Sequence, residues 1–220
     1  MQIPIIKLLD VTMSYENNTI FSNINLEIQS GEIIAAKGTI GSGKTTLLNL
    51  LCGIMKPDSG RIYIDKYDIT KLSSNKLSTL RAKIFGIVPQ KSNLVPELSI
   101  SQNLELPLMF SGIDKNKRQS IVNQTLDKLG LISLRDRLAG TLSVGESEIV
   151  SIARSMVNDP PILLMDEPTE GLDPIISEMI LSLIRGDSII NQKTVFITTH
   201  DERILNMANR VIHVKENMNL

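Results

Sequence analysis

The residues with the clearest chemistry form a glycine-rich segment that carries one lysine and two threonines. Residues 38–45 read Gly-Thr-Ile-Gly-Ser-Gly-Lys-Thr, the spacing of a phosphate-binding loop between a strand and a helix. Glycines let the backbone curl so that successive N–H groups point at phosphate oxygens, and the following helix turns its positive dipole end toward the same anion. A glycine-rich turn with an exposed lysine is the alternative. The loop alone predicts a phosphate ligand without specifying the nucleotide.

Side chains of this loop have separate expected roles. Lys44 would reach the β and γ phosphates of a nucleoside triphosphate, Thr45 would bind Mg²⁺ through its hydroxyl, and Thr46 would contact the α phosphate. The residues predicted to bind the nucleotide in this segment are Gly38, Gly41, Ser42, Gly43, Lys44, Thr45 and Thr46.

Two adjacent acids follow an apolar run, where a buried strand is expected to end. Residues 162–165 are Ile-Leu-Leu-Met, and Asp166 and Glu167 come next. Because ligands bind at strand ends in open parallel sheets, Asp166 is predicted to hold Mg²⁺. Glu167 leaves the opposite face of the strand and is predicted to activate water as general base. A solvated acidic loop is the alternative, but the phosphate loop upstream favours a metal site.

A histidine ends another predicted strand. Residues 198–201 read Thr-Thr-His-Asp, and a neutral His200 could donate a hydrogen bond to the γ phosphate and position the attacking water. A lone histidine is more often a surface or helix-capping residue, but the neighbouring motifs favour the catalytic role. His213 lies inside the last predicted strand and is expected to be structural.

These residues need elements that bring them to one edge of a sheet. The later β-branched runs alternate with helical patterns, which predicts parallel strands with crossover helices, whereas the early runs are spaced like a small antiparallel sheet. No convincing strand lies between Val88 and Ile162, so a helical insert is expected there. Strands are predicted at residues 24–28, 32–36, 61–64, 84–88, 162–165, 194–199 and 210–214. Helices are predicted at residues 44–51, 100–110, 117–129, 146–157, 174–185 and 202–208.

Composition limits the remaining possibilities. The chain has 220 residues, 42% of them hydrophobic, which suits one α/β domain with a sizeable core. Its net charge of −1 gives no long-range attraction for nucleic acid, and its single cysteine, Cys52, excludes an internal disulfide and favours a reducing cytosol. No apolar stretch approaches the ~18 residues that span a bilayer, and residues 1–10 lack the pattern of a secretion signal. Any membrane role is therefore expected to depend on a partner.

Taken in order, these motifs resemble those of ABC-type ATPases over nearly the whole chain. Gln90, within Val-Pro-Gln, matches the glutamine that in the family ligates Mg²⁺ beside the groove for a membrane subunit. Residues 168–173 resemble the D-loop, which implies that Asp173 contributes to nucleotide binding, and His200 matches the switch histidine. Tyr15 lies where the family places an aromatic ring that stacks on adenine, although a tyrosine that packs at a strand edge is the alternative.

Residues 142–146 align with the family's signature motif, Leu-Ser-Gly-Gly-Gln, which contacts the γ phosphate held by the opposite subunit. Ser143 and Glu146 also have the spacing of a helix capping box, and Gly145 leaves the backbone accessible. The sequence departs from the motif at Val144, which replaces glycine, and at Glu146, which replaces glutamine. A carboxylate near the γ phosphate is repulsive, so hydrolysis is expected to be slower than usual. A sandwich that does not hydrolyse ATP is the alternative.

The resemblance implies an α/β P-loop NTPase with the ABC-ATPase fold. Such a fold has a RecA-like core, an antiparallel β subdomain and an inserted α-helical subdomain. Residues 1–90 and 159–220 would form the nucleotide-binding core with its β subdomain, and residues 91–158 the helical subdomain with the signature motif, all within a single domain. The implied cofactors are ATP and Mg²⁺.

The segment at residues 93–108 is most similar to the branch of lipoprotein-releasing, macrolide-efflux and cell-division ATPases. The implied partners are a second copy of the chain around two ATP molecules and an integral membrane transporter subunit, with no nucleic acid. The implied location is the cytoplasm, where the chain would attach to the inner face of the plasma membrane by binding that subunit. Export or extraction of a lipoprotein, peptide or hydrophobic compound is expected, and ATP-gated control of an extracellular or periplasmic activity is the alternative.

Two other classes explain the motifs less well. A soluble ABC protein of translation or DNA repair usually carries two cassettes or a long coiled-coil insertion, and neither is seen in this sequence. A small-molecule kinase with a phosphate loop would not explain the signature, the D-loop and the histidine together.

Overall fold

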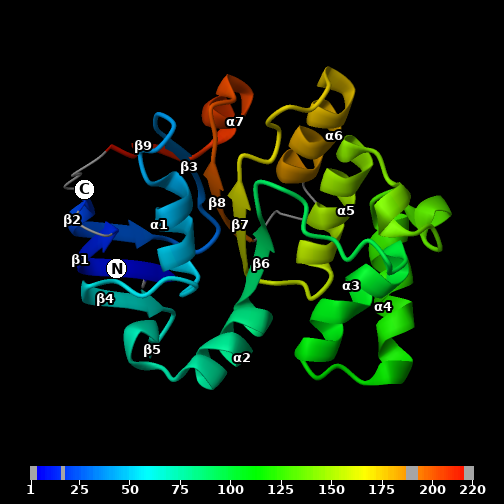
Figure 1. Cartoon of the computed structure of the whole chain (residues 1–220), viewed down its shortest axis with the longest axis horizontal. Helices are drawn as coiled ribbons and strands as arrows, with labels where there is room; N and C mark the ends of the chain where they lie inside the picture. Colours follow the sequence, from blue (N-terminus) through cyan, green and yellow to red (C-terminus); the bar gives the residue numbers. More distant parts are fainter. Residues whose placement is uncertain (1–3, 16–17, 187–192, 216–220) are drawn as a thin grey trace.

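A five-stranded parallel sheet occupies the centre of the molecule (Figure 1). The computed structural model describes residues 4–15, 18–186 and 193–215. The strand order is β6-β7-β8-β3-β9, and every residue of β7 and β8 is buried, as expected for parallel strands covered on both faces. The strands are β3 (Ile33–Lys37), β6 (Phe85–Val88), β7 (Ile162–Asp166), β8 (Thr194–Thr198) and β9 (Arg210–His213).

Side chains of the parallel sheet alternate between two hydrophobic cores. Leu164 lies in one core with Leu47 of helix α1 (Lys44–Leu51), and its neighbour Leu163 lies in the other core with Ile180. This alternation follows from the two-residue period of a strand and places helices on both faces. The helices that contribute to the second core include α5 (Val144–Met156), α6 (Pro174–Arg185) and α7 (Glu202–Met207).

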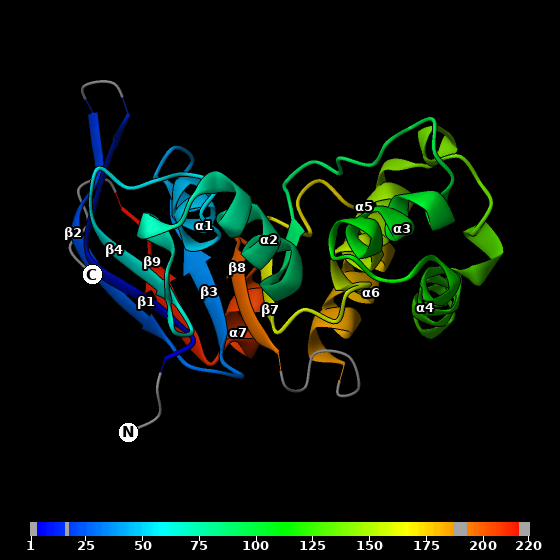
Figure 2. The same ribbon diagram turned by 90° about the horizontal axis from the view of Figure 1, so that it is seen from below.

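A four-stranded antiparallel sheet, in the order β2-β1-β4-β5, packs onto the first core. Figure 2 shows it at the opposite end of the molecule from helices α3 and α4. Apolar residues of its strands contribute to the same core as α1, so the sheet supports the helix that carries the phosphate loop. The strands are β1 (Ile6–Tyr15), β2 (Asn18–Ile28), β4 (Ser59–Ile64) and β5 (Tyr67–Asp68).

One early strand is missing from the prediction, and another is assigned to the wrong sheet. β1 has no counterpart among the predicted strands because Asp10 takes a φ of 49° and the register shifts between Leu8 and Val11, which interrupts the alternation of apolar side chains. The predicted strand at residues 32–36 is not part of the antiparallel group, because β3 lies between β8 and β9 in the parallel sheet.

Helices fill the chain between β6 and β7, as predicted. All six predicted helices are present, with ends that differ by two residues or less. An additional helix, α2 (Ser74–Ile84), has no predicted counterpart because none of its residues is fully buried and its apolar face is weak. Between β6 and β7 the helices are α3 (Ile100–Phe110), α4 (Lys115–Lys128) and α5, with 3₁₀ turns at Ile132–Leu134 and Ala139–Thr141. A further 3₁₀ turn, Ile69–Lys71, precedes α2. In the three described stretches of the chain, every helix is too short or too polar to cross a bilayer.

Candidate active site

The phosphate loop connects β3 to α1 and leaves the start of that helix without a side-chain cap. Gly43 is the N-cap residue, and none of the described side chains caps the helix. Because the first N–H groups of a helix have no partner within it, this end suits an anion. Gly43 has a φ of 95°, and a Cβ there would lie 2.6 Å from Ile20 Cγ2, so another residue would strain the loop.

The space beside the loop fits a phosphate ligand. Ser42 is buried, and within the part of the chain that the structure describes its hydroxyl oxygen has no hydrogen-bond partner. A Cβ at Gly38 would lie 2.4 Å from this oxygen, so glycine keeps the space open. An unpartnered buried hydroxyl costs about 1–3 kcal/mol, and a ligand oxygen placed here would remove that cost.

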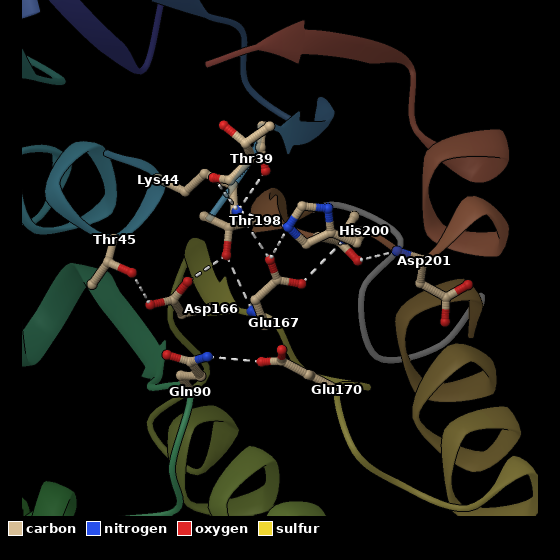
Figure 3. A network of polar contacts seen from close by, with 12 residues as sticks. Thr39, Lys44, Thr45, Gln90, Asp166, Glu167, Glu170, Thr198, His200 and Asp201 are labelled. Carbon is tan, nitrogen blue, oxygen red and sulfur yellow. Dashed lines mark hydrogen bonds and ion pairs between the residues drawn. The ribbon is translucent and has the colours of Figure 1, made fainter. Parts of the chain in front are cut away.

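Lys44 turns toward the carboxyl edge of the parallel sheet and is held there by four neighbours (Figure 3). Its ammonium donates to the carbonyl oxygens of Gly38, at 2.7 Å, and of Thr39, at 3.3 Å. It also lies 2.9 Å from His200 Nε2 and 3.4 Å from Glu167 Oε1. A buried ammonium is costly without such partners, so these contacts stabilise the charge.

Asp166 ends β7 and accepts hydrogen bonds from two threonines. Thr45 Oγ1, in the first turn of α1, donates to Asp166 Oδ2 at 2.8 Å. Thr198 Oγ1, at the end of β8, donates to Asp166 Oδ1. The structure therefore brings together the two predicted ligands Thr45 and Asp166, and such hard oxygen donors suit Mg²⁺.

Glu167 adopts a backbone conformation that is rare for a glutamate. Its φ is 47°, in the left-handed region, and such conformations persist only where neighbouring contacts enforce them. Its N–H donates to the backbone oxygen of Thr198, at 3.0 Å, and to the side-chain oxygen, at 3.1 Å. Glu167 Oε2 accepts a hydrogen bond from the main-chain N–H of His200 at 3.1 Å. These bonds hold the carboxylate beside Lys44 and His200 (Figure 3).

The contacts of His200 define which ring nitrogen carries the proton. Nε2 lies 2.9 Å from Lys44 Nζ and 3.4 Å from Glu167 Oε1. An ammonium only donates, so Nε2 accepts and the proton of a neutral ring is on Nδ1. The donor role predicted from the sequence therefore requires Lys44 to move toward a nucleotide and Nε2 to gain a proton.

Gln90 is not brought into the pair of Thr45 and Asp166. Its amide donates to Glu170 Oε2 at 2.7 Å, and Figure 3 shows this exposed pair beside the Lys44 group. Gln90 follows the end of β6 by two residues, so it lies at the same edge of the sheet. A role as metal ligand would require it to leave Glu170.

Three other predicted contacts lie outside the polar network of Figure 3. Tyr15 ends β1, and 64% of its surface is exposed. Asp173 is the N-cap residue of α6, where Oδ1 accepts from the N–H groups of Ile175, at 2.9 Å, and Ile176, at 3.0 Å. Thr46 is half-buried in the first turn of α1.

The signature segment begins α5, and Figure 1 shows that helix across the parallel sheet from α1. The predicted capping box is confirmed, since Ser143 Oγ accepts from the Glu146 N–H at 3.2 Å and Glu146 Oε2 accepts from the Ser143 N–H at 2.8 Å. A Cβ at Gly145 would lie 2.9 Å from Ile176 Cγ1, so glycine allows α5 and α6 to approach closely. Val144 is 73% exposed and covers no core.

Two residues that the structure places at the site, Thr198 and Arg137, are not predicted from the sequence. Thr198 fixes both Asp166 and the Glu167 backbone, and a threonine pair before His200 at a strand end is the signal that would have found it. Arg137 donates to Glu146 Oε1 at 2.7 Å. These residues are nine positions apart across a turn, so no helix or strand period indicates their contact.

Comparison with known sequences supports the family resemblance. The family model described as ABC transporter matches residues 21–170. The chain is 36% identical to the lipoprotein-releasing system ATP-binding protein LolD of Saccharophagus degradans, over 98% of this chain and 96% of that protein. It is 34% identical to the macrolide export ATP-binding/permease protein MacB of Vibrio parahaemolyticus, over 96% of this chain and 33% of that longer protein.

Solved structures agree with the sequence comparison. The dimeric post-hydrolysis structure of the ATP-binding cassette MJ0796 of Methanocaldococcus jannaschii, bound to ADP and Pi, matches with a TM-score of 0.88 and 33% identity. The match covers 96% of this chain and 94% of that one. The predicted family and fold class are therefore confirmed. The chain belongs to the ABC transporter family, as an ATP-binding and ATP-hydrolysing cassette.

Proposed function

We propose that ATP hydrolysis takes place where Lys44, Asp166, Glu167 and His200 meet, and that two copies of the chain enclose two ATP molecules. One observation carries this proposal: a buried lysine, two buried acids and a histidine gather beside the uncapped start of α1. Lys44 would exchange its carbonyl contacts for oxygens of the β and γ phosphates. The loop residues would add backbone N–H groups, and Thr46 a contact to the α phosphate.

Thr45 and Asp166 would hold Mg²⁺, with Gln90 as a further ligand once it leaves Glu170. Thr198 occupies Asp166 Oδ1, so Oδ2 is the oxygen that faces Thr45. Mg²⁺ supplies positive charge that stabilises the phosphoryl oxygens during transfer.

Glu167 would act as general base. As a water oxygen attacks the γ phosphorus, the carboxylate takes the water proton, and the bond to the β,γ-bridging oxygen breaks to give ADP and phosphate. The main-chain N–H of His200 donates to Glu167 Oε2. The other carboxylate oxygen, Oε1, would therefore accept the proton. His200 would orient the γ phosphate and the water from the other side.

A second copy would supply the signature residues. The signature residues Ser143, Gly145 and Glu146 stand at the start of α5. Figure 1 shows α5 across the sheet from α1, so a nucleotide at Lys44 would meet these residues only from another subunit. The dimeric state of the MJ0796 cassette supports this arrangement. Tyr15 would stack on adenine through its exposed ring, and Asp173 would lie at the D-loop between the subunits.

Val144→Gly is expected to raise the rate of ATP hydrolysis by roughly 3- to 10-fold, because it uncovers the backbone beside Ser143 for the phosphate of the opposite subunit. The melting temperature should fall slightly, since glycine disfavours the helical state. Steady-state phosphate release at saturating ATP measures the rate, with Val95→Gly as the matched control outside α5. An unchanged or lower rate would show that the valine does not limit hydrolysis.

A groove beside β6, the strand that ends two residues before Gln90, would receive the membrane subunit. It has a volume of about 470 Å³ and lies among α2, β6, α3 and the end of α5. Phe110 is 77% exposed on its rim. Arg154 also lines the groove, where its guanidinium donates to the backbone and side-chain oxygens of Asn93 and burial lowers its pKa. We infer an occupant that is a short, mainly apolar segment of the membrane subunit with at least one carboxylate. Residues 91–158 would then act as a helical subdomain that moves against the nucleotide-binding core.

Phe110→Ser is expected to release most of the chain from membranes, because it removes the largest exposed apolar side chain at the rim of the groove. The chain would be produced in its own cells, and its share in washed membrane vesicles compared with wild type by immunoblot. Tyr67→Ser removes an exposed aromatic from β5, outside the groove, and should leave that share unchanged. Equal release of both variants, or of neither, would count against the groove.

The wider role that these features favour is export or extraction. The similarity to LolD and MacB supports a chain that works on the cytoplasmic side of the plasma membrane with an integral membrane subunit and moves a lipoprotein, peptide or hydrophobic compound. Control of an extracellular or periplasmic activity by the same ATP cycle is the second candidate. The net charge of −1 gives no support to nucleic acid as a partner.

A further inference from the structure

Glu146 presents a charge problem at the start of α5. It is the only acid in the first turn of that helix, and 31% of its side chain is exposed. In the proposed dimer the same helix end meets the γ phosphate of the opposite site, so an unbalanced carboxylate would repel the ligand that the helix must bind. The structure contains a group that balances this charge.

That group is Arg137, which holds the carboxylate from the side opposite Ser143. Arg137 Nη1 lies 2.7 Å from Glu146 Oε1, and the Ser143 main-chain N–H donates to Oε2 at 2.8 Å, so both oxygens are engaged. The Ser143 N–H and then the Arg137 guanidinium lower the pKa of Glu146, so the side chain is ionised at neutral pH. The charge must therefore be balanced, because protonation does not remove it.

The position of Arg137 is fixed by its own segment. Its second terminal guanidinium nitrogen, Nη2, donates to the carbonyl oxygen of Thr141 at 2.9 Å. Its backbone oxygen accepts from the N–H of Ile100 at 2.9 Å, and its backbone N–H donates to Leu134 at 3.0 Å. These bonds fix the orientation of the planar guanidinium, so its donors point in set directions.

We propose that Arg137 is a positioning residue for nucleotide-driven dimer formation: it neutralises Glu146 and keeps the carboxylate turned back, so that the Ser143 hydroxyl is presented to a phosphate. The proposal rests on the proposed function, because it assumes that α5 meets the γ phosphate of a second copy. It predicts that arginine is needed only because residue 146 is an acid. The alternative is an ordinary surface ion pair, which would contribute little to stability and nothing to dimer formation.

The test uses the full chain with Glu167→Gln, which preserves bound ATP, and adds Arg137→Gln, Glu146→Gln or both. Light scattering coupled to gel filtration gives the ATP concentration at which half of the protein is dimeric. We expect Arg137→Gln to raise this concentration by about tenfold or more, which corresponds to at least 1.4 kcal/mol. Glu146→Gln should leave it unchanged or lower it. The double variant should return to within about twofold of the parent, since the amide oxygen introduced by Glu146→Gln can still accept from the Ser143 N–H.

Three controls separate a charge effect from damage to the fold. Arg135→Gln removes a positive charge two positions away, where the side chain contacts Asn123 and Asp136 instead of the signature residues. It should behave like the parent. The defect of Arg137→Gln should also depend on salt, because screening weakens the repulsion between a carboxylate and a phosphate. The melting temperature without nucleotide should be within a few degrees of the parent in all variants.

The outcomes distinguish a failure of the proposed function from a failure of the role of Arg137. A Glu167→Gln parent that binds ATP but never dimerises would remove the proposed function. If the parent dimerises and Arg137→Gln dimerises at the same ATP concentration, the role of Arg137 is wrong. A defect that Glu146→Gln does not rescue would also overturn it, because it would show that Arg137 acts on something other than the carboxylate.

Discussion

Glu167→Gln is expected to lower steady-state ATP hydrolysis by about 10²- to 10⁴-fold while ATP still binds. The amide cannot take a proton from water. Its oxygen can still accept the hydrogen bond that the main-chain N–H of His200 gives to Glu167 Oε2 at 3.1 Å in the wild type. The left-handed backbone at this position is held by bonds from the main-chain N–H to Thr198, so the exchange of side chain should not disturb the strand end. Phosphate release at saturating ATP and Mg²⁺ measures the rate.

Glu178→Gln is the matched control for this prediction. Glu178 lies on α6 and pairs with Arg203 at 3.0 Å, so the same chemical change there removes a charge outside the nucleotide site. Its rate should remain close to wild type. If Glu167→Gln retained more than about a tenth of the wild-type rate, another group would have to be the base.

Lys44→Ala is expected to weaken ATP binding by about 100-fold or more. Hydrogen bonds from a charged group contribute about 1.5–3 kcal/mol each, and Lys44 would give more than one to the phosphates. The substitution also leaves Glu167 without the cation that lies 3.4 Å away, so a carboxylate would face the incoming γ phosphate unbalanced. Titration with a fluorescent ATP analogue, and competition by ATP, measure the affinity.

Lys71→Ala provides the control for the loss of one lysine. Lys71 is an exposed residue that pairs with Asp68 at 3.5 Å, on the antiparallel side of the molecule. It should bind the analogue with wild-type affinity. Equal affinity of Lys44→Ala and wild type would remove the phosphate-loop assignment, because the buried ammonium would then have no ligand to hold.

Lys44 links the two side chains that the proposed mechanism assigns to hydrolysis. Its ammonium lies 3.4 Å from Glu167 Oε1 and 2.9 Å from His200 Nε2, so the proposed base and the histidine share one cation. If Lys44 binds the phosphates as proposed, His200 Nε2 becomes free to act as a donor and Glu167 Oε1 is left open to water.

Site residues that belong to short, contiguous motifs could be predicted well. The phosphate loop, the acids after residues 162–165 and His200 each follow a strand, and parallel strands bring such ends to one edge. The loop itself predicts the helix that follows it. These features are local, so the sequence contains all the information that they require.

Features that depend on distant contacts or irregular backbone could not be predicted in the same way. β1 is hidden because the bulge at Asp10 breaks the alternation of apolar residues. The exact partner of Gln90 depends on Glu170, 80 positions later, and Arg137 reaches Glu146 across a turn. Placement of β3 in the parallel sheet depends on pairing with β8 and β9, both far along the chain.

ATP is expected to bring two copies of this chain together around two shared nucleotides. The mass of the Glu167→Gln chain in solution, measured by light scattering with ATP, with ADP and without nucleotide, shows whether this happens. The mass of two chains is expected with ATP and Mg²⁺, and the mass of one chain in the other two conditions. A single-chain mass at an ATP concentration that saturates binding would rule out the ATP-bound dimer.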